Sequence, residues 1–233
     1  MIELFPGGFE EIDRPHGVEL VAYTDSGGEE RMWHAFGGAR AADVADGWEL
    51  RWREFHQPVH VGDLWIGQSW HEPPPGAIAV VIDPGRAFGT GAHPTTRLAL
   101  ELLATLPRGS LLDIGCGSGV LAIAAAKLGF APVSALDHDA ASVESARLNA
   151  EANGVVVSVT HGDALLGELP PADVAVANVT REVVERVAGR LRAVRLLASG
   201  YLVSEPETLP GFRHVRRAAA EGWAADLFEP LDR

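Results

Sequence analysis

The sequence predicts an α/β protein whose larger part is a mainly parallel sheet with helices on both faces. From residue 77 onward, short apolar runs alternate with segments whose apolar residues recur at helical spacing. A glycine-rich turn directly follows one of these runs, and two β-like runs close the chain as a predicted antiparallel hairpin. A length of 233 residues fits one full domain with a smaller appendage.

Residues 1–47 and 48–76 differ in composition from the rest of the chain. The first region contains β-like runs at 18–23 and 31–36, separated by glycine pairs, although the second run has few β-branched residues. The second region is rich in tryptophan, histidine and proline. Its proline run at 73–75 cannot continue a helix or a central strand, so we expect residues 48–76 to be a linker.

The remaining region, 77–233, contains short apolar runs that are typical of buried strands. These strands are predicted at 77–82, 110–114, 132–136, 155–160, 173–177 and 196–203. The hairpin that closes the chain is predicted at 212–219 and 223–228.

Four helices are expected between these strands. They are predicted to begin at Pro94, after Gly119 and after Asp139, with a fourth near 181–191. Proline suits a first helical position because it lacks the N–H that would be unsatisfied there. Strands and helices that alternate in this way favour a parallel sheet with helices on both sides.

Charge and cysteine content narrow the classes of function. The chain has 32 acidic and 19 basic residues, a net charge of −13, and residues 1–47 contribute −7 from ten acids and three arginines. This acidity argues against nucleic-acid binding through a broad basic surface and favours a basic partner. No apolar run is long enough to cross a bilayer, and a single cysteine, Cys116, is typical of a reducing compartment. We therefore expect a cytoplasmic protein without a membrane partner.

The segment from Asp113 to Gly119 reads D-I-G-C-G-S-G and lies between a predicted strand and a predicted helix. Glycines in such a turn let the backbone approach a ligand at a helix N-terminus. A dinucleotide fingerprint would need its third glycine at position 120, where Val120 stands. The spacing is similar instead to motif I of class I methyltransferases, which bind S-adenosylmethionine (SAM). An acid at this turn suits the ammonium and sulfonium groups of SAM, although a glycine turn without a ligand is the alternative.

Two further acidic residues follow the next two strands. Asp137 ends the strand after the glycine turn, where a carboxylate can accept hydrogen bonds from ribose hydroxyls. Asp163, in the sequence Gly162-Asp163-Ala164, resembles the methyltransferase position that meets the adenine amino group; an ordinary turn is the alternative. NAD-dependent enzymes share the ribose acid, so the glycine spacing is what favours SAM over NAD.

The most distinctive segment runs from Asp83 to Thr96 and reads D-P-G-R-A-F-G-T-G-A-H-P-T-T. Together with Q-S-W-H-E-P at 68–73 and A-N-V at 177–179, it resembles the ribosomal protein L-eleven methyltransferase family over about residues 48–204. The resemblance implies a class I methyltransferase fold: a Rossmann-like, mainly parallel seven-stranded sheet with an antiparallel edge hairpin. It also implies SAM as the cofactor and S-adenosylhomocysteine as the product.

The resemblance also implies roles for individual residues. Asn178 matches the family's asparagine beside the transferred methyl group, which makes it the expected catalytic residue. The expected SAM-binding residues are Phe88, Gly89, Thr90, Gly91, Thr96, Asp113, Gly115, Gly117, Asp137, Asp163 and Asn178. For His93 and Thr95, capping the helix and orienting the loop is at least as good an interpretation as ligand contact.

The function that the resemblance implies is methyl transfer to amines of a large-subunit ribosomal protein, at lysine side chains and also at the N-terminal amine. No protein nucleophile is needed, because an acceptor amine attacks the methyl group directly once it has lost its proton. The family begins with a longer ferredoxin-like domain, so residues 1–47 are expected to be a shortened α+β version of that substrate-recognition domain.

Three alternatives remain open at this point. The acceptor could be another protein or a small molecule, the chain could be a catalytically silent SAM-binding module, and a nicotinamide-dependent oxidoreductase is disfavoured by glycine spacing alone. A metal site is not expected. His56 and His60 are four residues apart, but Pro58 between them spoils a helical metal pair, and one cysteine cannot build a thiolate site.

Overall fold

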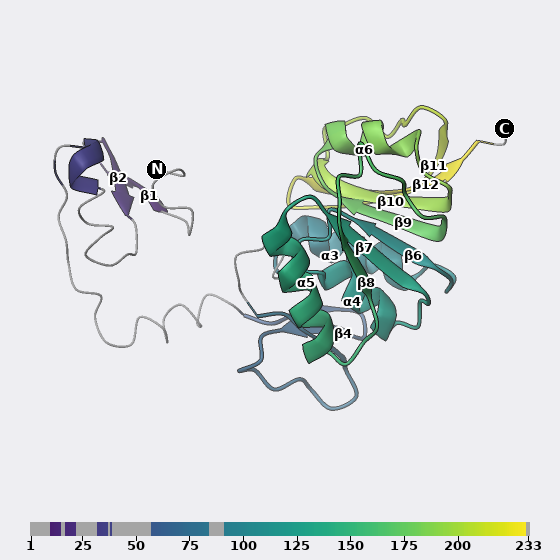
Figure 1. Cartoon of the computed structure of the whole chain (residues 1–233), viewed down its shortest axis with the longest axis horizontal. Coiled ribbons are helices and arrows are strands. Elements are labelled where there is room, and N and C mark those ends of the chain that lie inside the picture. Colours follow the sequence, from purple (N-terminus) through teal and green to yellow (C-terminus); the bar gives the residue numbers. More distant parts are fainter. Residues whose placement is uncertain are drawn as a thin grey trace. The chain divides into compact units, whose positions relative to one another are not determined.

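The computed structural model describes residues 10–14, 17–21, 32–36, 38, 57–83 and 91–231. The chain divides into two compact units, Met1–Arg53 and Glu54–Arg233. In the first unit, β1 (Glu10–Arg14) and β2 (Gly17–Val21) pair as an antiparallel two-stranded sheet (Figure 1). Residues 32–36 are helical, so the strand expected at 31–36 is wrong. That run lacks the β-branched residues that favour strands.

The second unit is built on a seven-stranded sheet, as the family resemblance implies, whereas the strand predicted at 77–82 belongs to a smaller sheet. The strand order is β11-β12-β10-β9-β6-β7-β8. The strands are β6 (Leu111–Ile114), β7 (Val133–Asp137), β8 (Ser158–His161), β9 (Ala172–Asn178), β10 (Ala193–Leu202), β11 (Phe212–Ala220) and β12 (Trp223–Pro230). Strands β6 to β10 pair in parallel, and β12 pairs antiparallel with both β10 and β11. The mainly parallel sheet and its antiparallel edge hairpin are therefore confirmed.

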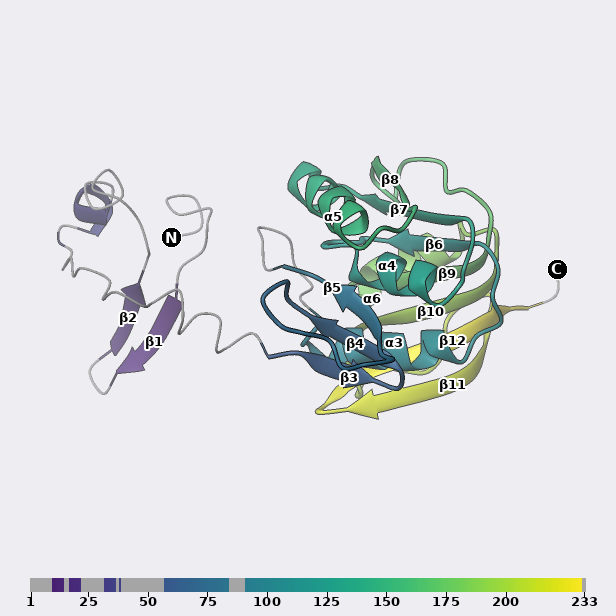
Figure 2. The ribbon, with the colours of Figure 1, turned by 90° about the horizontal axis from the view of Figure 1, so that it is seen from below.

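Helices cover both faces of this sheet (Figure 2). The four helices are α3 (Pro94–Ala104), α4 (Val120–Lys127), α5 (Ala140–Ala152) and α6 (Arg181–Ala188). Val174 and Val176 of β9 belong to the same buried cluster as α3, α4 and α5, whereas Ala175 and Ala177 share a second cluster with α6. Since successive side chains of a strand point to opposite faces, the central residues 174–177 of β9 are all apolar because both faces of the strand are buried there.

A smaller three-stranded sheet packs against the α3 and α4 side of the same unit. Its strands are β3 (Val59–Val61), β4 (Leu64–Gly67) and β5 (Ile78–Val81), with β4 antiparallel to β3 and parallel to β5. Leu64, Trp65 and Ile66 are at most 2% exposed. The part of the expected linker that the structure describes, 57–76, therefore contains two strands of the larger unit. This apolar run is buried where a linker would leave it in solvent.

The order of the strands places the carboxyl ends of β6, β7 and β9 at one edge of the sheet. The chain proceeds from β6 outward to β7 and β8, then returns to β9 on the other side of β6. Ligands of open α/β sheets bind at such a reversal point, beyond the carboxyl ends of the strands. Across the described residues, no helix is long and apolar enough to span a membrane.

Candidate functional site

A cavity of about 690 Å³ lies at this reversal point, within the size range of small-molecule sites. Residues from the ends of β6, β7 and β9, the start of α3 and the turn after β8 line it. Seven residues predicted from the sequence lie around it: Thr96, Asp113, Gly115, Gly117, Asp137, Asp163 and Asn178. Phe88, Gly89 and Thr90 lie outside the described residues. Gly91 does not line the cavity; it is buried against Ile66.

Two glycines of the turn, Gly115 and Gly119, occupy positions where a side chain would not fit. Gly115 has φ +68°, and a Cβ there would lie 2.6 Å from Cγ1 of Val179, at the end of the neighbouring strand. Gly119 has φ +81°, and a Cβ there would meet Ala146 of α5 at 3.0 Å. Both residues occupy the left-handed region that side chains disfavour. The turn is thus closely packed between β9 on one side and α5 on the other.

Asp113 lies beneath the turn and is 1% exposed. Its Oδ2 accepts a hydrogen bond of 3.1 Å from the backbone N–H of Ala122, in the first turn of α4. The N-cap of this helix is Gly119, which has no side chain to supply, so the carboxylate of Asp113 supplies the cap. Burial, with a smaller contribution from Asp137, raises the pKa of Asp113 to about 7, against the lowering effect of the Ala122 hydrogen bond. A cationic ligand beside it would favour the ionised form.

The other two acids are held by backbone amides. Asp137 accepts hydrogen bonds of 2.9 Å from the N–H groups of Gly117 and Asp139, which fix its carboxylate between the glycine turn and α5. Asp163 accepts one of 2.7 Å from Leu165 N–H and therefore forms the turn that the sequence left as an alternative. Both also line the cavity, so the turn and a ligand contact are compatible at Asp163.

Asn178 is the last residue of β9 and lines the same cavity as the acids of β6 and β7. Its Nδ2 lies 3.3 Å from Oγ1 of Thr96, in the first turn of α3. Its Oδ1 is buried and has no hydrogen-bond partner among the described residues. A buried carbonyl oxygen without a donor costs about 1–3 kcal/mol. A bound group that carries an N–H would satisfy it.

Cys116 lies in the glycine turn, and none of its described neighbours activates its thiol. Burial and the nearby Asp113 and Asp137 raise its pKa above the ordinary value, so the thiol stays protonated at neutral pH. Within the described ranges, no group of three or more His, Cys, Asp or Glu side chains could hold a metal ion. The polar lining of the cavity consists of carboxylates, backbone amides, the Asn178 amide, the hydroxyls of Thr96 and Ser142, and the His138 ring.

The structure also places residues that the sequence reasoning did not select. His138 and Ser142 line the cavity beside Asp139, which caps α5 through the N–H groups of Ala141 and Ser142. Val183 lines it from α6. Their only sequence signal is closeness to Asp137 and Asn178. His93 accepts a hydrogen bond from Thr95 N–H as the N-cap of α3, in agreement with the capping interpretation.

Comparison with known proteins supplies the family. A family model described as "Ribosomal protein L11 methyltransferase (PrmA)" matches residues 29–225. A ribosomal protein L11 methyltransferase of Shewanella pealeana is 42% identical over 181 residues, which is 71% of this chain and 60% of that protein. One from an Exiguobacterium species is 38% identical over 196 residues, 76% of this chain and 63% of that protein. The chain thus spans about 60% of the length of the curated relatives it matches.

A solved structure agrees with this match. The crystal structure of a ribosomal protein L11 methylase from Lactobacillus delbrueckii subsp. bulgaricus superposes with a TM-score of 0.66 and 26% sequence identity. The alignment covers 75% of this chain and 99% of that one. The fold is that of class I methyltransferases, and this family uses SAM as its methyl donor. The chain belongs to the ribosomal protein L11 methyltransferase family.

Proposed function

We propose that this protein is a SAM-dependent N-methyltransferase that acts on lysine side chains of ribosomal protein L11, with the N-terminal amine of that protein as a further acceptor. The observation that carries the proposal is Asn178. Its buried Oδ1 lacks a partner among the described residues and belongs to a cavity lined by four carboxylates, those of Asp113, Asp137, Asp139 and Asp163. The names of the relatives support the choice of ribosomal protein L11 as acceptor.

The residues around the cavity fit SAM. Asp113 provides a carboxylate for a cationic ligand, and Asp137 can accept hydrogen bonds from ribose hydroxyls. The turn at Gly115 and Gly117 would hold the methionine part, and Asp163 would accept from the adenine amino group. Thr96, which lines the cavity, is proposed to complete the binding residues together with Phe88, Gly89 and Thr90. When bound, SAM supplies a methyl group on a positively charged sulfur.

Asn178 would orient the acceptor nitrogen. Its Nδ2 faces the hydroxyl of Thr96, which leaves Oδ1 available to accept an N–H from a neutral amine. A lysine amine has a pKa of about 10.4 in water, and removal from solvent beside a positive charge lowers that value. A neutral amide oxygen suits this step because it binds the amine without stabilising its protonated form as a carboxylate would. Position and exclusion of water then provide most of the rate.

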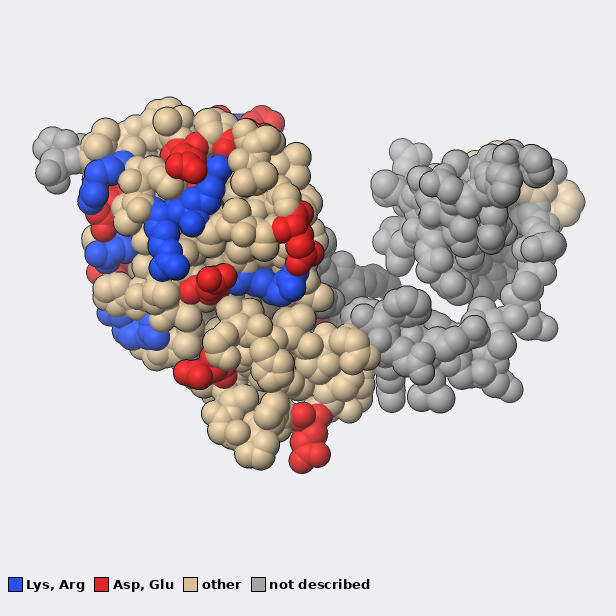
Figure 3. Space-filling model, turned by 180° about the vertical axis from the view of Figure 1, so that it is seen from behind, with Lys and Arg blue, Asp and Glu red and all other residues tan. Residues whose placement is uncertain are grey.

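The proposed partner is a basic protein, and no direct nucleic-acid contact is proposed. The face in Figure 3 has basic side chains gathered on one part of it, with acidic ones among them. Two arginines of the closing hairpin are already paired: Arg213 with Glu229, and Arg217 with Asp226. The charge of these two arginines is already matched by a carboxylate, which supports the proposal that they do not bind nucleic acid. A cytoplasmic location, suggested by the single cysteine, is part of the same proposal.

Two measurements test this function. Calorimetry should detect SAM binding that Asp137→Asn weakens and that Glu144→Gln, on an exposed position of α5, leaves unchanged. Incubation with labelled SAM and ribosome-free ribosomal proteins, followed by mass spectrometry, should place the label on amines of ribosomal protein L11. NAD binding without SAM binding would contradict the cofactor. SAM binding without label in any protein would contradict the acceptor and favour a small molecule or a silent module.

A further inference from the structure

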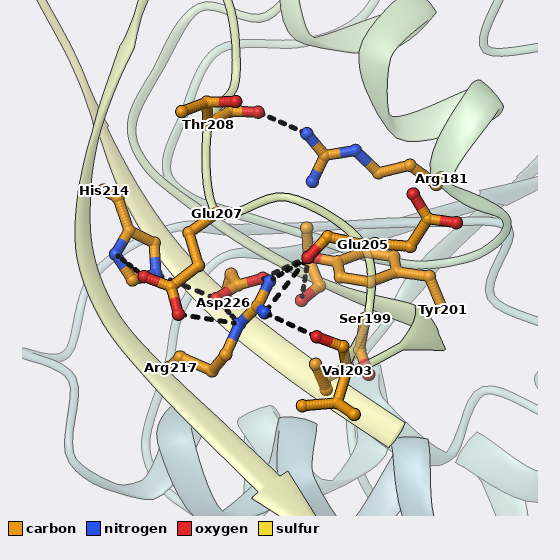
Figure 4. Close-up of polar contacts among 12 residues, drawn as sticks. Arg181, Ser199, Tyr201, Val203, Glu205, Glu207, Thr208, His214, Arg217 and Asp226 are labelled. Atoms are coloured by element: carbon orange, nitrogen blue, oxygen red, sulfur yellow. Dashed lines mark hydrogen bonds and ion pairs between the residues drawn. The ribbon is translucent and has the colours of Figure 1, made fainter. Parts of the chain in front are cut away.

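The turn that carries Asn178 is tied to the closing hairpin by polar side chains that lie outside the cavity (Figure 4). Arg181, three residues after Asn178, is the first residue of α6 and is 8% exposed. Its Nε donates to Oε1 of Glu185 at 2.9 Å, and its Nη2 donates to the carbonyl of Thr208. The guanidinium carbon lies 5.4 Å from the centre of the Tyr201 ring. Arg181 therefore connects the Asn178 turn with the segment that follows β10.

The same segment is held from its other side by the hairpin. Asp226 of β12 is fully buried and receives Nε and Nη2 of Arg217, each at 2.8 Å, while Nε2 of His214 lies 2.8 Å from its Oδ1. Arg217 also donates to the carbonyls of Val203 and Glu205 at 3.1 Å. Although burial raises the pKa of Asp226, the hydrogen bonds from Arg217, His214 and Tyr201 hold it below its usual range. A buried carboxylate with this many donors forms a rigid anchor.

Tyr201 joins the two sets of contacts. Its hydroxyl lies 2.9 Å from Oδ2 of Asp226, and its ring lies against Arg181. Residues 203–208 are therefore bound at one end by Arg217 and at the other by Arg181. This segment follows β10, the parallel neighbour of β9, so it leaves the sheet beside the end of β9 where Asn178 lies. The backbone N–H of Val179, the residue after Asn178, donates to the carbonyl of Ser199 at 3.0 Å, so the Asn178 turn rests on β10, the strand that residues 203–208 continue.

Arg181 also has a feature that stability alone does not explain. Its Nη1 is buried and has no hydrogen-bond partner in the part of the chain that the structure describes. An unpaired buried donor is costly, and an apolar side chain of similar length would avoid this cost. Residues that violate such local rules are found preferentially where function requires them.

We propose that Arg181 is a positioning residue for methyl transfer, which sets the orientation of the Asn178 amide by holding its turn against residues 203–208. This inference rests on the proposed role of Asn178 and extends it to a residue that does not line the cavity. Arg181 would contribute to the rate of the transfer step and leave SAM binding unchanged, because its contacts lie on the side of β9 that faces β10 and the hairpin.

Arg181→Met tests this proposal, because it keeps the length of the apolar stem and removes the planar donors. We expect kcat to fall about 10- to 100-fold, as displacements of about 1 Å in active sites do, with the Kd of SAM within about twofold of wild type. The melting temperature should fall only modestly, because the Glu185 carboxylate that is left without its partner is about half exposed and no buried charge is left unpaired. Arg186→Met is the matched control on the same helix, where the arginine side chain is 57% exposed.

A double-mutant cycle with Asn178→Ala separates positioning from general damage. If Arg181 acts through Asn178, Arg181→Met should lower kcat in the wild-type background and have little further effect in Asn178→Ala. Three results would each overturn the proposal. The kcat losses of the two single variants could multiply in the double variant, the Kd of SAM in Arg181→Met could rise as much as kcat falls, or the kcat of Arg181→Met could equal that of Arg186→Met.

A spectroscopic readout keeps this inference distinct from the proposed function. The side-chain amide resonances of Asn178, identified by their loss in Asn178→Ala, should shift in Arg181→Met and stay in place in Arg186→Met. This measurement needs no acceptor, so failure of wild-type protein to methylate any protein would contradict the proposed function alone. Unchanged Asn178 resonances in Arg181→Met would overturn the positioning role even if the enzyme methylates its acceptor.

Discussion

The side-chain Nδ2 of Asn149, on α5, donates a 2.9 Å hydrogen bond to the backbone carbonyl of Ser118, in the glycine turn. Asn149 is 9% exposed, and Gly119 packs against Ala146 one helical turn earlier. The turn that faces the cavity is therefore held in place by a helix that begins after β7. This contact joins the two motif segments around Asp113 and Asp137 that the sequence analysis treats separately.

We expect Asn149→Leu to weaken both folding and SAM binding. Loss of the buried hydrogen bond should lower the free energy of unfolding by about 1–3 kcal/mol, because the carbonyl of Ser118 loses this donor inside the protein. Calorimetric affinity for SAM should fall because the glycine turn is less firmly placed. Glu144→Gln, exposed on the same helix, is the control. An Asn149→Leu protein with unchanged affinity would show that α5 does not position the turn.

The main sheet could be predicted because its determinants are local in sequence. The apolar runs, Pro94 at the start of α3, and Asp139 as the cap of α5 all act within a few residues of themselves. The role of 64–66 was missed, because the proline and tryptophan content around this run suggested a linker. Its burial depends on pairing with β5 and on packing against distant helices.

The candidate site also has a part that could be predicted from the sequence and a part that could not. Six of the seven selected residues that line the cavity lie at or just after the carboxyl ends of parallel strands, where an α/β pattern places ligand sites; Thr96 joins them from the first turn of α3. The Arg181 contacts could not be predicted, since Arg181 reaches Thr208 across 27 positions and Tyr201 reaches Asp226 across 25. No spacing rule connects residues that meet only after the hairpin folds back onto β10.

The pH dependence of SAM binding should follow Asp113. Its folded pKa of about 7 means that the side chain is mostly protonated at pH 6 and mostly ionised at pH 8. A cationic ligand favours the ionised form, so affinity for SAM should rise through this range and level off above it. Binding near pH 7 should also release a proton, which calorimetry in buffers of different ionisation enthalpy detects.

The same shift has a defined consequence for the protein without ligand. The unfolded chain ionises Asp113 near its ordinary value of 3.8, whereas the folded chain does so near 7. Between these values the folded state binds more protons, so the contribution of Asp113 to stability decreases as the pH rises and is constant above about 7. Asp113→Asn should remove this pH dependence both from the affinity for SAM and from the free energy of unfolding. A wild-type affinity that does not change between pH 6 and 8 would contradict the assignment.

Gly200 should be essential for the position of the Asn178 turn. It lies in the bulge of β10 with φ +101°, and a Cβ there would collide with the backbone of Val179, the residue after Asn178. Gly200→Ala therefore combines left-handed strain of about 1–2 kcal/mol with a displaced turn. Gly211→Ala is a matched control, because Gly211 has φ +81° and open space where a Cβ would lie.

Thermal unfolding and methyl transfer distinguish the two glycine variants. Both should melt at lower temperature than the wild type, whereas a loss of kcat beyond about tenfold should be confined to Gly200→Ala. Equal losses of activity in both variants would mean that strain in the hairpin region, and not contact with Val179, limits the enzyme.

Asn178→Ala should lower methyl transfer far more than it lowers SAM binding. The substitution removes the Oδ1 that is proposed to orient the acceptor amine, while the carboxylates of Asp113 and Asp137 remain. Removal of one oriented hydrogen-bonding group from an active site typically costs about 10²–10³ in kcat, and the Kd of SAM should change by no more than a few-fold. Asn178→Asp is a second test at the same position. Its carboxylate would favour the protonated form of the acceptor amine, which cannot attack the methyl group. The rate of this variant should therefore recover as the pH rises and more of the amine is neutral. Equal losses of SAM affinity and kcat in Asn178→Ala would remove Asn178 from the acceptor side of the site and assign it to cofactor binding.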